Sequence, residues 1–404
     1  IFNVIDELIK NKKKLKDLQN KSYKNFYLTN KYISKKIDSY RLKLVSKKLN
    51  ITSSRLLKSK LKIIHITNFN ERHNGRLFYN TGKRINNGLV RLGHSVLEFS
   101  DRDILSNNRK LSDLNGADFL NKKLLNVIGN YTPDLIVLGH ADLIDIKTLK
   151  IIKKYYPETK ITQWFLDRMD SEWINNKSRF LKKIDIMDSN FCTTDPNSLK
   201  HSKKYPIYYL PNPVDKSFET LKNYKNKVLK NDVFFAMSHG VHRGVLKKGK
   251  FDKRELFLKK LTNKLPNIKF DIYGVSDKEP IWADNFIKIL SQSKIALNLS
   301  QGKPSKYYTS DRFAQLIGNG LLVLIDKKIS YNNLFNSNEI ISYNNLKDLT
   351  NKIKMYANND KLRQKIAKNG RNKYFKYFNS TVVAEYIINK TFNIKKKYYW
   401  ENKG

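Results

Sequence analysis

Short apolar runs rich in β-branched and aromatic residues alternate along most of the chain with segments whose apolar residues recur at helical spacing. Polar or glycine-containing segments bound these runs, which have the length and composition of buried strands. The alternation predicts an α/β fold in which helices cover both faces of a parallel sheet. The predicted strands span residues 61–67, 94–100, 134–139, 160–165, 185–191, 206–210, 232–238, 268–274, 294–300, 320–326 and 339–343.

A polar segment with two prolines, LPNPVDKSF at 210–218, interrupts the alternation. It predicts a linker between two consecutive doubly wound units, at 61–210 and 211–390, with a basic tail at 391–404. In such sheets ligands bind at the carboxyl ends of the strands. In a protein with two units, those ends can face one cleft.

Residues 1–60 differ from the rest of the chain. Apolar residues at helical spacing (Ile5, Leu8, Ile9, Leu15 and Leu18) and the lack of Gly and Pro predict helices there. The segment carries 17 Lys and Arg against 4 Asp and Glu, a net charge of +13, while the other 344 residues carry +30. Two interpretations stay open: a solvated helical hairpin packed on the body, or an arm that docks on an anionic membrane or a partner.

The net charge of the whole chain is +43. Such a charge favours an anionic partner, such as nucleic acid, a membrane face or a phosphorylated substrate. The alternative is a coding bias, because Lys, Asn, Ile, Tyr and Phe are read by A/T-rich codons and are all abundant. The sequence has no zinc-finger spacing and no RNP-like aromatic motif, so no specific nucleic acid is predicted.

Cys192 is the only cysteine, which excludes an intrachain disulfide and suits a reducing compartment. No apolar run approaches the ~18 residues of a membrane-spanning helix. No secretory leader pattern opens the sequence. We therefore expect a cytoplasmic protein, with residues 1–60 as the segment that could contact the inner membrane face.

In the first unit, the candidate chemical groups follow the predicted strands. His73 lies beside Gly75 in the loop after the first strand, where a permissive backbone would turn the chain into a helix. His140 and Asp142 follow the strand at 134–139, where a catalytic base or a ligand for sugar hydroxyls would lie. A structural role is the alternative for each, and Asp142 could instead cap the next helix.

Asp101 and Asp103 have the D-x-D spacing by which some nucleotide-sugar transferases hold a divalent metal. Short acidic triplets are common, and these two residues could equally bound a loop. No metal site is predicted.

In the second unit, the segment 237–256 combines glycines with Arg and Lys after the first predicted strand. Glycines let backbone N–H groups approach a ligand and the basic side chains neutralise phosphate, so the segment predicts a diphosphate cradle rather than only a flexible basic loop. Its candidate ligands are Gly240, Arg243, Lys247 and Arg254. Further on, Gly274 ends a strand and Trp282 could form a wall against a nucleobase, or belong to the core.

The stretch NLSQGKPSKYYTSDRFAQLIGNGLLVLID at 298–326 places a polar loop and a helix between two predicted strands. Ser310 or Asp311 would cap the helix, and Gly318 and Gly320 would end it. A helix N-terminus with basic side chains suits a diphosphate, and the side chain one turn later could reach ribose hydroxyls. The candidate ligands are Ser300, Gly302, Lys306, Tyr307, Ser310, Asp311, Arg312 and Gln315.

The segment SDRFAQLIGNGLLVLID resembles the second-domain signature of group 1 glycosyltransferases, especially their CgeB-like branch. The closing segment NNDKLRQKIAKNGRNKYFKYFN is similar to the C-terminal end of that family. The resemblance covers roughly residues 61–390 and is strongest from 231 to 380; residues 1–60 lie outside it.

The resemblance implies a GT-B fold: two Rossmann-like doubly wound domains facing a cleft. The first domain would bind a glycan, lipid or other cell-surface acceptor, and the second a nucleotide sugar, UDP- or GDP-linked. No metal or other cofactor would be required, because basic side chains would stabilise the departing diphosphate. Gln315 and Tyr307 stand where the family usually has acids, which leaves the donor and the stereochemistry open. A sugar-nucleotide epimerase of the same fold and a basic nucleic-acid-binding protein are the alternatives.

Overall fold

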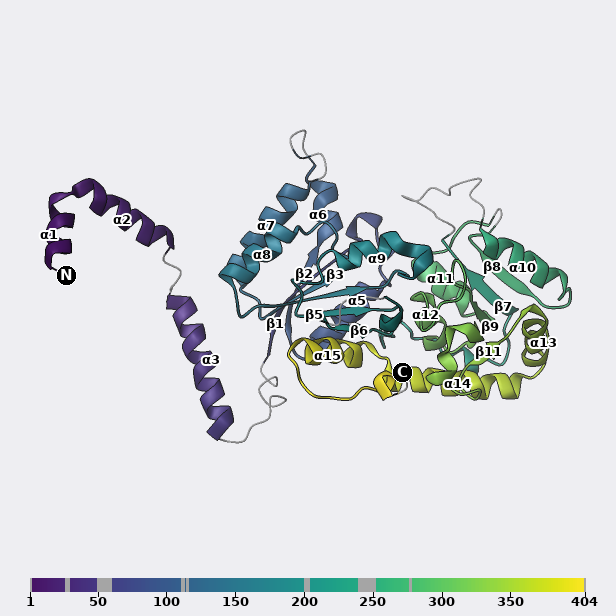
Figure 1. The fold of residues 1–404 in the computed structure, drawn as a ribbon. Coiled ribbons are helices and arrows are strands. Elements are labelled where there is room, and N and C mark those ends of the chain that lie inside the picture. Colours follow the sequence, from purple (N-terminus) through teal and green to yellow (C-terminus); the bar gives the residue numbers. More distant parts are fainter. Residues whose placement is uncertain are drawn as a thin grey trace. The chain divides into compact units, whose positions relative to one another are not determined.

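The computed structural model describes residues 2–25, 30–48, 60–109, 113, 116–199, 204–238, 252–275 and 278–402, in two compact units. The first of these compact units ends at Ser59 and the second begins at Lys60, so the second contains both sheets, whose surroundings are called the first and the second domain below. Within the first unit the predicted helices are confirmed as α1 (Phe2–Lys10), α2 (Lys12–Asn25) and α3 (Asn30–Lys48) (Figure 1). Among the described residues, none of the helices combines the length and the apolarity needed to cross a bilayer.

The second unit begins with a six-stranded sheet in the order β2-β1-β3-β4-β5-β6. All its strand pairs are parallel. From Ile63 to Thr67 the first strand is buried, as expected for a strand covered on both faces. The elements are β1 (Lys62–Thr67), η1 (Glu71–His73), α5 (Thr81–Arg91), β2 (Ser95–Ser100), α6 (Asp101–Asn107), α7 (Ala117–Tyr131), β3 (Leu135–Gly139), α8 (Ile146–Tyr155), β4 (Lys160–Phe165), η2 (Ser171–Trp173), α9 (Ile174–Leu181), β5 (Ser189–Cys192), η3 (Pro196–Leu199) and β6 (Ile207–Tyr209).

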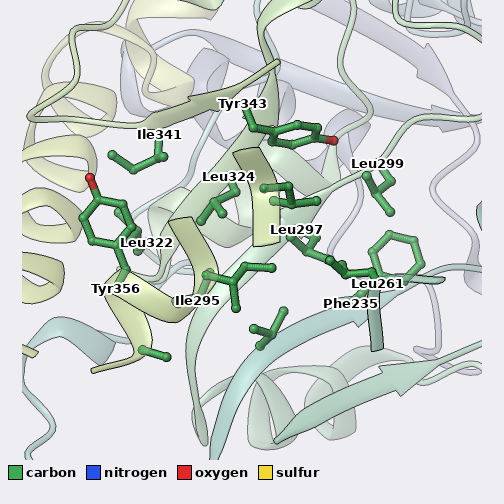
Figure 2. Packing of buried hydrophobic residues seen from close by; sticks show 14 of the residues in the cluster. Phe235, Leu261, Ile295, Leu297, Leu299, Leu322, Leu324, Ile341, Tyr343 and Tyr356 are labelled. Atoms are coloured by element: carbon green, nitrogen blue, oxygen red, sulfur yellow. The ribbon is translucent and has the colours of Figure 1, made fainter. Parts of the chain in front are cut away.

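A five-stranded parallel sheet follows, in the order β11-β10-β9-β7-β8. Its buried side chains pack against side chains of the covering helices, such as Leu261 and Tyr356 (Figure 2). The elements are η4 (Asn223–Lys225), β7 (Asn231–Ala236), α10 (Lys253–Asn263), β8 (Phe270–Tyr273), α11 (Ala283–Leu290), β9 (Ser293–Asn298), α12 (Arg312–Gly318), β10 (Leu322–Asp326), η5 (Lys327–Ile329), η6 (Tyr331–Asn333), β11 (Ile341–Tyr343), α13 (Leu346–Ala357), α14 (Asp360–Tyr377), α15 (Ser380–Thr391) and η7 (Tyr399–Asn402).

Both sheets reverse their strand order beside their first strand. β1 lies between β2 and β3, and β7 lies between β8 and β9. At such a reversal the connections leave in opposite directions, which opens a crevice at the carboxyl ends of the strands. The segments after β1, β3, β7 and β9 are therefore the places to look for a site.

The predicted linker at 210–218 is a buried connection. Asp215 is fully buried and accepts hydrogen bonds from the Arg91 guanidinium of α5, one of them at 2.9 Å. Just after the linker, Glu219 accepts from Arg84 of α5 at 2.5 Å, and both side chains are 1% exposed. Breaking one partner of such a buried pair leaves an uncompensated charge. The linker is therefore fixed to α5 by charge pairs.

Helix α15 follows the second sheet in sequence but packs against α5, which precedes β2 of the first sheet. The two helices approach so closely that a Cβ on Gly88 would lie 2.0 Å from the backbone oxygen of Ser380. The backbone N–H of Ser380 also donates to the Val214 carbonyl at 2.7 Å. The chain thus returns to the first sheet after the second is complete.

Helix α5 begins at Thr81, where the Asn80 side chain caps it by accepting from the Lys83 N–H at 2.9 Å. The residues before it form the turn η1 and an irregular loop. This loop, 68–80, becomes one wall of the site.

Candidate functional site

A cavity of about 310 Å³ lies between the two sheets' domains. The loop 68–80 after β1 forms one wall, and the end of β7 with the starts of α11 and α12 forms the other. We call it the interdomain cavity. Its lining residues are Asn70, Arg76, Leu77, Tyr79, Asn80, Ala236, Met237, Ser238, Pro280, Ile281, Trp282, Ala283, Phe286, Asp311, Arg312 and Gln315.

The Asp103 carboxylate fixes the conformation of the loop 68–80. This carboxylate accepts from the backbone N–H groups of Glu71 at 2.9 Å and Arg72 at 3.3 Å, and from the Arg72 guanidinium at 2.8 Å. Asn70 and Asn74 adopt left-handed backbone angles, with φ of 65° and 51°. Asp103 therefore has a structural partner set, which supports the loop-bounding interpretation of the D-x-D motif.

Two contacts cross the interdomain cavity. The Arg76 guanidinium lies over the Trp282 ring, 5.3 Å from its centroid. The Tyr79 hydroxyl donates to Asp284 at 2.6 Å, and this bond raises the pKa of Tyr79 to about 12. The Arg76 Nε is buried and has no hydrogen-bond partner among the described residues. The cavity thus holds a guanidinium with an unused donor.

On the opposite wall lie Arg312 and Gln315 of α12. Arg312 donates to the Leu299 carbonyl at 3.1 Å and lies 5.3 Å from the centroid of the Phe235 ring. Burial, together with the nearby charge of Arg254, lowers the pKa of Arg312 to about 10. Even so, the group is charged at neutral pH, and an anion in the cavity would relieve the cost of burying that charge.

The start of α12 differs from the sequence-based expectation. Asp311 is the N-cap residue, but its side chain makes no capping hydrogen bond and instead accepts from the Gln315 amide at 3.1 Å. The Ser310 hydroxyl is buried without a partner among the described residues. The predicted side-chain cap is therefore wrong, while the predicted end is right: α12 stops at Gly318, and Gly320 has a φ of 82°.

A second cavity, of about 250 Å³, opens at the carboxyl ends of β9, β10 and β11 and reaches the start of α10. The predicted residues Arg254, Ser300 and Gly302 line it. The Arg254 guanidinium is held by Asp252, with Nη2 2.7 Å from a carboxylate oxygen. The Ser300 hydroxyl is buried without a partner among the described residues. We call this space the strand-end cavity.

Other predicted donor residues point elsewhere. Lys306 lies 3.6 Å from Asp195 of the first domain, and Tyr307 accepts from the Asn333 amide at 2.9 Å. Both line a third, aromatic cavity described below. Gly274 has a packing role, because a Cβ there would lie 1.7 Å from the Met237 backbone oxygen. Gly240, Arg243 and Lys247 lie outside the described residues.

The three predicted catalytic residues do not line the interdomain cavity. His140, with a left-handed φ of 50°, uses its Nε2 to accept from the Leu166 N–H at 2.8 Å. Burial lowers the pKa of this imidazole. Its Nδ1 lies 3.8 Å from Asp167. The ring lines a cavity of only about 10 Å³.

Asp142 and His73 have different surroundings. Asp142 accepts from Arg179 and, at 3.4 Å, from Arg102. It does not cap α8, whose N-cap residue is Asp145. His73 ends η1 in the loop 68–80, within three residues of Arg76, and burial and Arg72 lower its pKa. Of the two predicted histidines, His73 therefore belongs to an element that forms the cavity wall.

Several residues of the interdomain cavity escaped the sequence-based reasoning, namely Asn70, Tyr79, Asn80 and Arg76 as a ligand. Arg76 has no local signal in the sequence, because its partner Trp282 lies 206 residues away. Among the residues that the structure describes, no three His, Cys, Asp or Glu side chains gather as a metal site would need.

Comparison with known proteins gives one family match. Residues 253–389, which contain α10 to α15 except the last two residues of α15, match the model of the family described as "Glycosyl transferase-like". No curated protein sequence matches the chain significantly.

Solved structures share the fold. HepE from Anabaena, in complex with UDP and glucose, is 9% identical, with 81% of this chain and 98% of that chain covered and a TM-score of 0.51. AviGT4, a glycosyltransferase involved in avilamycin A biosynthesis, is 10% identical, with 82% and 97% covered and a TM-score of 0.50. The predicted GT-B fold of two Rossmann-like domains is thus confirmed. The family match and this fold together support the predicted glycosyltransferase. The CgeB-like branch stays a prediction.

Proposed function

We propose that this protein transfers a sugar from a nucleotide-sugar donor to a glycan, lipid or other cell-surface acceptor. The interdomain cavity carries the proposal. In it, Arg76 of the first domain and Arg312 and Gln315 of the second line one space beside the Trp282 ring. Two guanidinium groups, an amide and an aromatic wall match the diphosphate, hydroxyls and ring of a nucleotide sugar.

The donor would occupy the second domain's side of the cleft. In this proposal Arg312 and Arg254 bind the diphosphate, and Gln315 donates to or accepts from ribose hydroxyls. Ser300, with its unpartnered hydroxyl, supplies a further hydrogen bond from the strand-end cavity. Gly240, Arg243 and Lys247 remain proposed phosphate ligands on sequence grounds alone.

The reaction needs charge stabilisation on the leaving group. An acceptor oxygen forms a bond to the anomeric carbon, the bond from that carbon to the diphosphate oxygen breaks, and the acceptor's proton passes to a base or to the diphosphate. Arg76 and Arg312 would stabilise the negative charge that develops on the diphosphate. We propose that they do so without a metal; full activity in excess chelator is expected, and loss of activity that Mg²⁺ restores would contradict it.

The acceptor's base is proposed from the first domain. His73 belongs to the loop that forms the cavity wall, whereas His140 would have to release the Leu166 N–H from its Nε2 or act through Nδ1. We therefore expect His73→Gln to reduce turnover more than His140→Gln. The reverse result would return the role to His140, with Asp142 and Asp167 as its charged neighbours.

The donor test is a calorimetric titration with UDP, GDP and their glucose conjugates. Because the Anabaena HepE structure contains UDP, a UDP-linked sugar is the first donor to test. Binding to the wild type and its loss in Arg312→Ala are expected. No binding of any nucleotide diphosphate would overturn the proposal. Sugar-nucleotide interconversion without an acceptor would instead indicate an epimerase.

The location of the acceptor enters the proposal through residues 1–60. Their charge of +13 suits a peripheral contact with an anionic membrane at the cytoplasmic face. Co-sedimentation of the full chain with vesicles containing phosphatidylserine, but not with phosphatidylcholine vesicles, is the expected result. If the chain sediments with neither kind of vesicle, the membrane contact is removed from the proposal.

A further inference from the structure

A third cavity, of about 300 Å³, lies apart from the proposed donor site. It forms where β6, the loop before α12, α15 and the C-terminal segment meet. None of its lining residues lines the interdomain or the strand-end cavity. We call it the aromatic cavity, because its wall includes the rings of Tyr208, Tyr209, Tyr307, Tyr386 and Trp400.

The rings of this wall are held rigidly. Tyr386 and Trp400 meet edge to face, with ring centroids 5.0 Å apart at 84°. Tyr209 and Tyr307 pack with centroids 5.7 Å apart, and the Tyr209 hydroxyl donates to the Tyr307 carbonyl at 3.1 Å. A preformed aromatic wall binds a ligand without the entropic cost of ordering side chains.

The polar groups of the wall decide which ligand fits. The two carboxylates there are already paired: Asp195 with Lys306 at 3.6 Å, and Glu401 with Lys390 at 2.5 Å. The local charge is therefore balanced, which favours neither a phosphate nor an ammonium ligand. Paired carboxylates still accept hydrogen bonds from hydroxyl groups, and the exposed Asn197 amide both donates and accepts.

We propose that the aromatic cavity binds a neutral saccharide. A pyranose ring presents a face of C–H groups to an aromatic ring and a rim of hydroxyls to carboxylates and amides. The half-buried rings of Tyr208 and Tyr209 can take that face, because Tyr386 and Trp400 are only 1% and 5% exposed and support the wall from behind. A volume of about 300 Å³ lies at the small end of ligand sites, so the ligand is a short saccharide or the end of a longer glycan.

The site is connected to the proposed donor site by one loop. Lys306 and Tyr307 lie in the connection between β9 and α12, and Arg312 is the first residue of α12. Tyr307 holds a left-handed φ of 57°, and its backbone N–H donates to the Ile329 carbonyl at 2.8 Å. A saccharide bound beside Tyr307 would stabilise this loop, so saccharide and donor should bind with mutual effect on affinity. This coupling, unlike the binding itself, rests on the proposed function.

The experiment starts with an array of neutral oligosaccharides built from hexoses and N-acetylhexosamines, probed with the full chain. Any glycan that binds is then titrated by saturation-transfer NMR against the wild type, Asn197→Ala, Tyr208→Ala and Arg312→Ala. We expect at least a tenfold loss of affinity in the two cavity variants and retained binding in Arg312→Ala. Asn126→Ala and Tyr155→Ala, at exposed positions of α7 and α8, are matched controls with unchanged affinity.

Three results would overturn the proposal. These are no neutral glycan bound by the folded wild type, binding that the two cavity variants retain, or binding that only Arg312→Ala removes. The unfolding midpoint of each variant is measured in parallel, so that loss of the fold is not read as loss of the site. Testing free monosaccharides beside longer glycans separates a small-molecule ligand from a glycan end. Failure here leaves nucleotide binding unaffected, whereas failure of the proposed function removes nucleotide binding and leaves the saccharide.

Discussion

The carboxyl ends of the two sheets carry similar polar residues, but these residues differ in how they are paired and in the volume of the space beside them. At the first sheet, Asp142 is held by Arg179 and Arg102, and Lys183 donates to the Ala141 carbonyl. The space left beside them is about 10 Å³. At the second sheet, the strand-end cavity measures about 250 Å³, and the interdomain cavity, which this edge shares with the loop after β1, measures about 310 Å³.

Several buried polar side chains without partners in the described part of the chain gather at the second edge. The hydroxyls of Ser300 and Ser310 and the amide of Asn298, all at the second edge, have no partners among the described residues. Buried polar groups normally have hydrogen-bond partners, so this cluster of side chains is available to bind a polar ligand. A polar residue at a strand end thus indicates a site only where its neighbours leave it unpaired.

The largest expected difference between the edges is in donor binding. Arg312→Ala removes a buried guanidinium from the interdomain cavity, and we expect donor-dependent turnover to fall roughly 10²- to 10³-fold, as for the loss of one group that stabilises developing charge. Arg179→Ala, the matched change at the first edge, should leave donor affinity unchanged. Calorimetry with UDP and steady-state rates measure both.

Equal effects of Arg312→Ala and Arg179→Ala would contradict this difference between the two edges. Equal losses would mean that the region around Asp142 and Arg179 also contributes to the donor site. Unfolding midpoints are needed for both, because Arg312 also donates to the Leu299 carbonyl. Arg312→Lys keeps the charge but not the fork of donors, so a partial loss in that variant would show that geometry contributes beside charge.

A smaller effect is expected from the contact that joins the edges. Arg76→Ala should reduce kcat roughly 10- to 100-fold, with less change in the donor's Kd, because Arg76 comes from the opposite domain and would act on the departing diphosphate. Trp282→Ala should share most of this loss if the ring positions the guanidinium. Additive losses in the double variant would contradict that positioning role.

Asp101 is a buried carboxylate at the first edge, and its pKa allows a stability test. Its carboxylate is 1% exposed, and burial raises its pKa to about 6. The unfolded chain ionises this group near pH 3.8, so the free energy of unfolding is lowered as the pH rises through about 6. Asp101→Asn should therefore stabilise the protein at pH 7, by ~1–2 kcal/mol after allowance for relaxation around the charge.

The measurement is denaturant unfolding of the wild type and Asp101→Asn between pH 4 and pH 8. The stability difference should grow with pH and level off above about 6. Asp118→Asn, at an exposed position of α7, is the matched control with little change. A wild type that stays more stable than Asp101→Asn at pH 7 would mean that the carboxylate has a favourable partner after all.

The fold was largely predictable from the sequence. Each predicted strand is present, because strands buried on both faces leave a nearly continuous apolar run such as β1 or β4. The site was predictable only in part. Arg312 and Gln315 were found because they follow a strand and a loop in sequence, whereas the Arg76–Trp282 contact joins two domains and has no local signal.

The direction in which the predicted side chains point was harder to predict from the sequence. Lys306 and Tyr307 lie in the predicted loop, but both line the aromatic cavity instead of the donor site. Tyr307 has a left-handed backbone, and its hydroxyl accepts from the Asn333 amide. A left-handed backbone is uncommon in a residue other than glycine, so it could not be predicted from the sequence. Pairing was equally hidden, since the Arg179 that holds Asp142 lies on α9, 37 residues further along the chain.

The smallest expected effect tests the paired state of the first edge directly. Asp142 is 25% exposed and Arg179 39%, so their ion pair is partly solvated and its removal in Asp142→Asn should change stability by no more than ~1 kcal/mol. Donor affinity should stay at the wild-type value, because neither residue lines the interdomain cavity. Acceptor-dependent turnover is the informative measurement. If Asp142→Asn lowers it while donor binding is intact, Asp142 contacts the acceptor and its pair with Arg179 must open during the reaction; if turnover is unchanged, the pair only fills the first edge.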